Sequence, residues 1–273
     1  MKARVISGVC IGVILFAALV PGGWVLWGML LAVSLIAFFE LARATGVHKK
    51  DRLLTLPELV GYIGILELYL TLRFTNALSC YIVSIMLVII ALFLVYIFSF
   101  PRIHSREIQA AMFCFLYAPC MLSFVYLLRE LPNGNYVVWV PFNAWICDTC
   151  AYFTGMFLGK HKLTPLLSPK KTIEGAIGGV LGSVIAGLVF GVILGHHVGN
   201  YHMIWIFVVV TFFESIVTQL GDLAASGIKR DYGIKDFGRI IPGHGGIMDR
   251  FDSVILASPV CYFLIVFLWT LIA

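Results

Sequence analysis

Long runs of apolar residues recur along the chain, and short polar segments separate them. A helix that crosses a bilayer needs about 20 consecutive, predominantly apolar residues. The pattern therefore predicts nine transmembrane helices. The expected spans are 5–21, 24–43, 57–73, 78–99, 110–128, 136–158, 175–195, 201–222 and 253–272. The third span is the least apolar, because it contains Glu67 and ends at Arg73.

Composition strengthens the membrane prediction. Of the 273 residues, 61% are hydrophobic and 12% are charged, and the mean hydropathy is +1.00. A soluble domain carries about 25% charged residues, so an all-α integral membrane protein is favoured over a soluble protein with a large core. We predict one polytopic domain over 1–273, with N-terminal helices at 1–135 and a C-terminal half at 136–273. No A-x-A cleavage site follows the first apolar run, so an uncleaved first helix is expected.

The basic residues predict an orientation. If the N-terminus is cytoplasmic, 17 of the 19 Lys and Arg residues fall in cytoplasmic segments, and only Arg73 and Arg129 fall outside. This bias follows the positive-inside rule. It places the loops 159–174 and 223–252 on one cytoplasmic face. The net charge of +5 then reflects cytoplasmic loops, and no nucleic-acid partner is expected. We expect a protein of the bacterial cytoplasmic (inner) membrane.

Acidic residues within or beside the spans narrow the search for chemistry. A carboxylate is costly in lipid, so each is expected to face protein, water or a partner, or to cap a helix. These acids are Glu40, Glu67, Asp148, Glu214 and Asp222.

The segment 159–179 combines lysines with hydroxyl groups around an expected helix start. Thr172 or a neighbour is expected to cap a helix that begins near Glu174. Free N–H groups at a helix N-terminus beside lysines form a phosphate site. A solvated basic loop beside anionic lipid explains the same lysines. The basic and hydroxyl residues are Lys160, Lys162, Lys170, Lys171, Thr164, Ser168 and Thr172.

The segment 222–252 carries five aspartates, at positions 222, 231, 236, 249 and 252. Magnesium prefers one or two carboxylates together with phosphate oxygens and waters. Asp222 is expected to close one span and Asp249 to open the next, so both would lie at the cytoplasmic side. The sequence PGHGG predicts a tight turn that lets the backbone approach a ligand. His244 in that turn would contact phosphate or transfer a proton; alternatively, the turn only reverses the chain and His244 is solvated.

These residues together predict metal-assisted chemistry on a phosphate that a lipid or a nucleotide carries. They also resemble a known family. SGIKRDYGIKDFGRIIPGHGGIMDRFD is similar to the signature of the phosphatidate cytidylyltransferase, or CDP-diacylglycerol synthase, family. DTCAYFTGMFLGKHKLTPLLSPKKTIEGAIGG resembles the second block that this family shares. The blocks lie within 143–253, and the N-terminal half agrees in length and hydropathy only.

The resemblance implies an enzyme that converts CTP and phosphatidic acid into CDP-diacylglycerol and pyrophosphate with Mg²⁺, in a homodimer within membrane lipid. Whether a second cation binds is left open. By resemblance, Asp222 and Asp249 are the metal ligands. We interpret Lys170, Lys171, Lys229 and Arg230 as phosphate clamps, Ser168, Thr172 and His244 as hydrogen-bonding groups, and Asp148 as a polar anchor. Further substrate-binding candidates are Lys235, Asp236, Gly245, Gly246 and Arg250.

Three alternatives compete with this interpretation. A cytidylyltransferase for an ether-lipid phosphate would need nearly the same headgroup site. A CDP-alcohol phosphotransferase should carry D-G-x-x-A-R followed by spaced aspartates, which the sequence lacks. A membrane transporter should show inverted repeats and broken helices at mid-membrane, whereas the polar clusters here lie at one predicted face.

Overall fold

The computed structural model describes residues 2–49, 51, 53–75, 77–241, 243 and 245–272. Its helices and strands, in chain order, are α1 (Lys2–Leu19), α2 (Gly23–Thr45), α3 (Leu56–Thr75), α4 (Leu78–Ser99), α5 (Ser105–Phe115), the π-helical turn η1 (Leu116–Cys120), α6 (Met121–Glu130), α7 (Gly134–Val137), the 3₁₀ turn η2 (Val140–Asn143), α8 (Ala144–Leu158), β1 (Lys162–Thr164), β2 (Ser168–Thr172), α9 (Ile173–Val198), α10 (His202–Asp231) and α11 (Met248–Ile272).

The predicted helical fold is confirmed in its main features. Helix covers all or part of each of the nine predicted spans, although the sixth is divided among α7, η2 and α8. Six helices of the described chain are long and apolar enough to cross a bilayer: Gly23–Thr45, Leu78–Ser99, Ser105–Glu130, Ile173–Val198, His202–Asp231 and Met248–Leu271. The count of nine spans and their orientation stay predictions. One element was not predicted, a two-stranded antiparallel sheet formed by β1 and β2.

The chain divides into two compact units. Unit 1 comprises Met1–Glu130 and Asp231–Phe251, and unit 2 comprises Leu131–Arg230 and Asp252–Ala273. The segment 231–251 thus belongs with the N-terminal helices, whereas the C-terminal half was expected to hold it. The prediction of one domain with a boundary near 135 stays a prediction.

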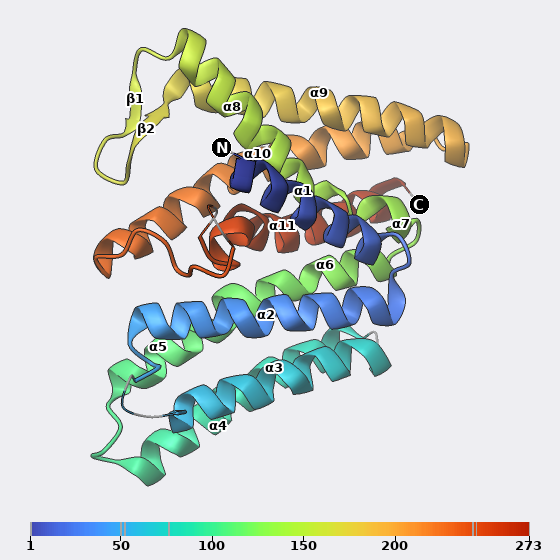
Figure 1. The fold of residues 1–273 in the computed structure, drawn as a ribbon. Coiled ribbons are helices and arrows are strands. Elements are labelled where there is room, and N and C mark those ends of the chain that lie inside the picture. The colour runs from blue at the N-terminus through green and yellow to red at the C-terminus, as the bar shows by residue number, and fades with distance from the viewer. Residues whose placement is uncertain are drawn as a thin grey trace. The chain divides into compact units, whose positions relative to one another are not determined.

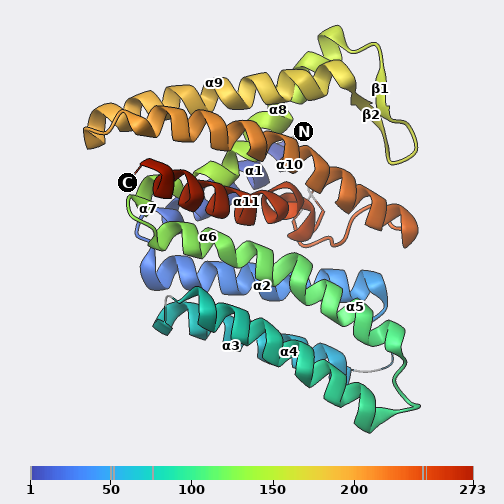
Figure 2. The ribbon, with the colours of Figure 1, turned by 180° about the vertical axis from the view of Figure 1, so that it is seen from behind.

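Unit 1 is a bundle in which α2 lies beside α3, and α3 and α4 form a helical hairpin (Figures 1 and 2). Small residues let these helices approach closely, as in other membrane proteins. A Cβ at Gly61 of α3 would collide with the ring of Phe38 on α2. The Ser34 and Tyr69 hydroxyls form a buried hydrogen bond of 2.7 Å that joins the same two helices. The apolar side chains of α4 that remain exposed include Ile82, Met86 and Ile90, as expected of a helix that faces lipid.

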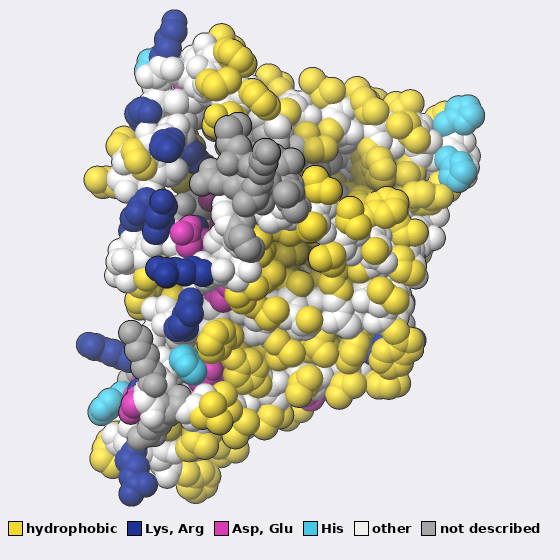
Figure 3. Space-filling model, in the orientation of Figure 1, with side chains coloured by type: hydrophobic (Ala, Val, Ile, Leu, Met, Phe, Trp, Pro, Cys, Tyr) yellow, Lys and Arg dark blue, Asp and Glu magenta, His cyan; other side chains and the backbone are white. Residues whose placement is uncertain are grey.

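Unit 2 is built on the close pair α8 and α9, with the β1–β2 hairpin connecting them at one end (Figure 1). Glycines on both helices make the pair possible. A Cβ at Gly175 would lie 2.8 Å from the Ala151 carbonyl oxygen and 3.2 Å from the Gly155 Cα. Four lysines of unit 2 lie in or directly before the hairpin: Lys160, Lys162, Lys170 and Lys171. Lys and Arg side chains gather at this side of the molecule, while hydrophobic side chains cover much of the surface over α9 (Figure 3). The hairpin and the residues directly before it therefore carry four of the five lysines of unit 2.

Candidate active site

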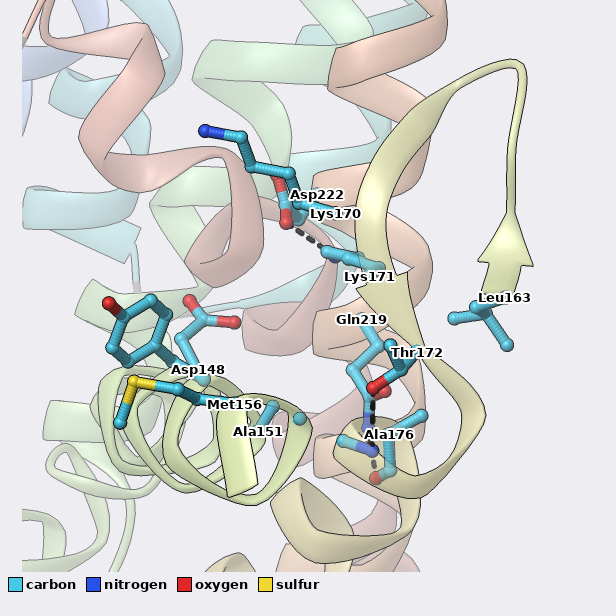
Figure 4. A pocket seen from close by; sticks show the side chains of 13 residues that line it. Asp148, Ala151, Met156, Leu163, Lys170, Lys171, Thr172, Ala176, Gln219 and Asp222 are labelled. Atoms are coloured by element: carbon cyan, nitrogen blue, oxygen red, sulfur yellow. Dashed lines mark hydrogen bonds and ion pairs between the residues drawn. The ribbon is translucent and has the colours of Figure 1, made fainter. Parts of the chain in front are cut away.

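A cavity of about 310 Å³ lies in unit 2 beside the start of α9. Its walls come from α8, the hairpin, α9 and α10 (Figure 4). The charged and polar side chains that line it belong to Asp148, Tyr152, Lys170, Lys171, Thr172, Gln219 and Asp222. Five of the predicted site residues thus line one cavity: Asp148 of α8, Lys170, Lys171 and Thr172 of β2, and Asp222 of α10. Tyr152 and Gln219, which also line the cavity, were not among the predicted site residues.

The ion pair between Lys171 and Asp222 connects the hairpin to α10. The Lys171 ammonium contacts Oδ2 of Asp222 (Figure 4), and both side chains are about one-quarter exposed, at 25% and 28%. Gln219, three residues earlier on α10, donates to the Ala176 carbonyl at 3.2 Å and so joins α10 to the first turns of α9. The carboxylate of Asp222 is therefore held at the cavity wall beside a cation.

The base of the hairpin is fixed by the first turn of α9. Thr172 precedes the helix, and its hydroxyl accepts a hydrogen bond of 3.1 Å from the Gly175 N–H, which confirms the predicted N-cap. The Glu174 carboxylate accepts from the Lys160 N–H at 3.0 Å and pairs with His161 Nδ1 at 2.6 Å. These contacts hold the two ends of the hairpin together, which positions Lys170 and Lys171 at the cavity.

A second group of charges in unit 2 surrounds the first turns of α11. Asp252 is 8% exposed, and its Oδ2 lies 3.9 Å from the Lys229 ammonium. The Ser253 hydroxyl donates to Asp148 Oδ2 at 3.4 Å. Asp252 also interacts electrostatically with Asp222 and Asp148. Asp252 was named as an oxygen donor from sequence but received no place in the site; its i, i+3 spacing from Asp249 was the available signal.

The carboxylates of unit 2 can take part in a Mg²⁺ site but do not form a complete one. Within the described ranges, no group of three or more His, Cys, Asp or Glu side chains could hold a metal ion alone. Magnesium is usually held by one or two carboxylates, with substrate phosphates and waters completing its shell. Asp148 and Asp222 present carboxylates at one cavity. This donor set fits a cation that the substrate helps to bind.

The signature segment 236–250 lies in unit 1, where Asp249 organises its backbone. Oδ2 of Asp249 accepts hydrogen bonds from the Phe237 N–H at 2.8 Å and the Gly246 N–H at 3.0 Å. Gly245 has a φ of +84°, and its carbonyl accepts a hydrogen bond from the Ile241 N–H at 2.9 Å; Pro242 of the predicted PGHGG turn lies outside the described residues. His244 lies outside the described residues. The shared metal site of Asp222 and Asp249 stays a prediction.

The remaining predicted site residues of these segments are exposed or partly buried. Lys235 and Asp236 are exposed in the loop before the turn, and Arg250 is partly buried in the first turn of α11. Ser168 pairs with Thr164 across the hairpin and is not among the residues that line the cavity.

One boundary prediction was wrong. Asp222 does not close its helix, because α10 continues to Asp231 and carries Lys229 and Arg230 in its last turn. Residues 223–230 contain one glycine and no proline, and the first positive-φ glycine after Asp222 is Gly233. The polar end of α10 therefore extends the helix, and the predicted loop 223–252 shrinks to the connection between α10 and α11.

Two of the acids within the predicted spans accept hydrogen bonds from side chains of the protein. Glu214 is fully buried in unit 2 and accepts hydrogen bonds from Asn143 at 3.1 Å, Ser183 at 3.4 Å and Thr218 at 2.9 Å. This cluster joins η2, α9 and α10. Glu67 in unit 1 accepts from Thr71 and Ser84. The buried Glu214 and the half-buried Glu67 thus serve as hydrogen-bond acceptors between helices, as expected of carboxylates inside a membrane domain.

Known proteins resemble this chain over nearly its whole length. The model of the cytidylyltransferase family matches residues 2–268. A phosphatidate cytidylyltransferase of Staphylococcus epidermidis is 32% identical over 268 residues, which is 97% of this chain and 99% of the relative. Proteins of the same name from Staphylococcus saprophyticus and Staphylococcus aureus are 32% and 31% identical, with the same coverage of both chains.

Proposed function

Because the chain belongs to the cytidylyltransferase family, we propose that it is a phosphatidate cytidylyltransferase that forms CDP-diacylglycerol and pyrophosphate from CTP and phosphatidic acid. The observation that carries the proposal is similarity to enzymes of that name over nearly all of both chains. The cavity supports it, because it places two lysines and two carboxylates at the charged end of a membrane unit.

The proposed reaction needs binding and charge neutralisation more than a protein nucleophile. An oxygen of the phosphatidate phosphate attacks the α-phosphorus of CTP. The bond from that phosphorus to the bridging oxygen breaks, and pyrophosphate leaves with the electron pair. Lys170 and Lys171 lie where their ammonium groups can bind these phosphates. Positioning and electrostatic stabilisation are the main contributions that such a site can make.

We propose that Asp222 and Asp249 hold Mg²⁺, with Asp148 close to the first of them. When bound, the cation would neutralise charge on the phosphates. Asp222 already has a cation beside it, the Lys171 ammonium. Lys171 would therefore limit the repulsion between this carboxylate and an incoming polyphosphate. The number of cations, and homodimer formation, stay predictions.

We also propose that the hairpin end faces the cytoplasm and that the protein lies in the bacterial cytoplasmic membrane. The lysines around the hairpin support this orientation through the positive-inside rule. In a variant whose seven native cysteines are replaced by serine or alanine, a single cysteine introduced at Pro165 between the strands should react with an impermeant maleimide only in inverted vesicles. A cysteine at Gly199, after α9, should react only in intact cells. The opposite labelling pattern would refute the orientation.

The activity is tested with purified protein in detergent, labelled CTP, phosphatidic acid and Mg²⁺. Labelled liponucleotide should form, and pyrophosphate should appear in equal amount. An ether-linked lipid phosphate, offered separately, tests the second candidate substrate. Absence of product with both lipids would refute the proposed function.

A further inference from the structure

Glu40 of α2 caps the N-terminus of α11, which begins 208 residues later in the chain. Its carboxylate is 1% exposed and accepts hydrogen bonds from the Ile247 N–H at 3.2 Å and the Met248 N–H at 2.8 Å. The first N–H groups of a helix have no partner within the helix, and a negative charge at that end is favourable. A buried acid of unit 1 thus supplies the acceptor that the local sequence of α11 does not.

Two glycines of the signature segment make room for this carboxylate. A Cβ on Gly238 or on Gly246 would collide with the Glu40 carboxylate, and a Cβ on Gly238 would also lie 2.9 Å from the Gly246 Cα. Larger residues at either position would push Glu40 away from the two N–H groups. The glycines in this segment therefore serve the approach of Glu40, in addition to the turn at Gly245.

Arg43, one turn further along α2, holds the other end of the segment. Its Nη2 donates to the Phe237 carbonyl at 2.9 Å. The Phe237 N–H donates to Asp249, which also accepts from Gly246. The contacts close into a ring that runs from Arg43 through Phe237 and Asp249 to the start of α11, and back to Glu40.

We infer that Glu40 and Arg43 are positioning residues of the active site: they fix the segment 237–248 and thereby orient the Asp249 carboxylate. The inference rests on the proposed function, because Asp249 matters here as a proposed metal ligand. Neither residue touches the reacting atoms in this role. A purely structural role for Glu40, in which it only satisfies a helix end, would stabilise unit 1 without affecting turnover.

Glu40→Gln separates these roles. The carboxamide keeps one acceptor oxygen but turns an NH₂ group toward one of the two N–H donors. We expect kcat at saturating CTP and lipid to fall about 10- to 100-fold, as for other residues that orient a ligand. KM for CTP should change by less than about threefold. Hydrogen exchange at the Ile247 and Met248 amides should accelerate about tenfold or more.

Glu58→Gln is the matched control. Glu58 is also a fully buried acid of unit 1: its Oε2 accepts from the Thr55 N–H at 3.4 Å at the start of α3, and it pairs with His48 at 3.0 Å. It makes none of the contacts of the ring. We expect Glu58→Gln to lower the melting temperature in detergent while kcat and the two exchange rates stay within about twofold of wild type.

Arg43→Gln tests the ring of contacts at an exposed position. The substitution therefore removes the hydrogen bond to the Phe237 carbonyl without disturbing the core. It should lower kcat less than Glu40→Gln and accelerate exchange near Phe237. The inference is overturned if Glu40→Gln keeps wild-type kcat, or if Glu58→Gln loses as much. Wild-type protein that makes no liponucleotide would instead contradict the proposed function, and the exchange measurements would still show whether the ring orders the segment.

Discussion

The Lys171 ammonium and the Asp222 carboxylate form an ion pair that joins the β1–β2 hairpin to α10 at the wall of the cavity. The pair sets a proposed phosphate clamp beside a proposed metal ligand. Its two members also come from the two segments that the sequence analysis singled out separately.

Lys171→Met should lower kcat/KM roughly 10²- to 10³-fold, because the variant removes a positive charge from the place where phosphate charge accumulates. Turnover of labelled CTP measures the effect. Lys162→Met, on the paired strand and outside the cavity lining, is the control and should stay near wild type. Equal activity of the two variants would remove Lys171 from the site.

Asp222→Asn should lower turnover about 100-fold or more while the protein stays folded, since the amide is a poor ligand for Mg²⁺ and no longer pairs with Lys171 as an anion. A Mg²⁺ titration of activity, with circular dichroism for the fold, measures both effects. Asp231→Asn, the same substitution at the exposed end of α10, is the control and should leave turnover near that of wild type. Near-normal turnover of Asp222→Asn at low Mg²⁺ would exclude it as a metal ligand.

Glu214→Ala should destabilise the protein, because Asn143, Ser183 and Thr218 lose their common acceptor. Each buried group left unpaired costs about 1–3 kcal/mol. Unfolding in a denaturing detergent series measures the loss. Thr149→Ala removes an exposed hydroxyl that bonds only within α8 and should have little effect. A Glu214→Ala protein as stable as wild type would show that the cluster contributes nothing.

Gly175→Ala should force α8 and α9 apart, because its Cβ would lie 2.8 Å from the Ala151 carbonyl oxygen. Such overpacking costs typically about 1–3 kcal/mol. Gly28→Ala adds the same methyl group where nothing lies within 4 Å, so it should be neutral or stabilising by up to about 1 kcal/mol. Thermal melting of both variants in detergent compares them; equal melting temperatures would contradict the proposed packing.

The apolar pattern predicted the helices well because an α-helix makes all of its backbone hydrogen bonds within one segment, as the lipid environment requires. The Thr172 cap was also readable, since a hydroxyl before a helix start is a local signal. The end of α10 was misplaced because the first polar residues after the apolar run were taken as the end of the helix. Residues 223–230 contain no proline and one glycine, so the backbone stays helical to Asp231. The hairpin was missed because its strands, of three and five residues, are too short to show an alternating pattern.

Contacts between distant residues could not be predicted. Glu40 was recognised as an acid that must cap, pair or face protein, but nothing in the sequence pointed to Ile247 and Met248 as its donors. The role of Asp249 in ordering the Phe237 and Gly246 backbone was hidden for the same reason. Periodicity and local motifs describe neighbours along one element, whereas these bonds depend on how elements meet.

The place of segment 231–251 in unit 1 has a consequence for biosynthesis. The helices of the first 130 residues emerge early, but the partners of Glu40 and Arg43 are made only after residues 131–230. At about 5–20 residues per second, synthesis of residues 131–230 takes roughly 5–20 s, and only then is segment 231–251 of unit 1 made. During that interval a carboxylate destined for burial has no donor from α11. A chain that ends before residue 247 would leave the Glu40 carboxylate without these two donors and unit 1 without its last segment.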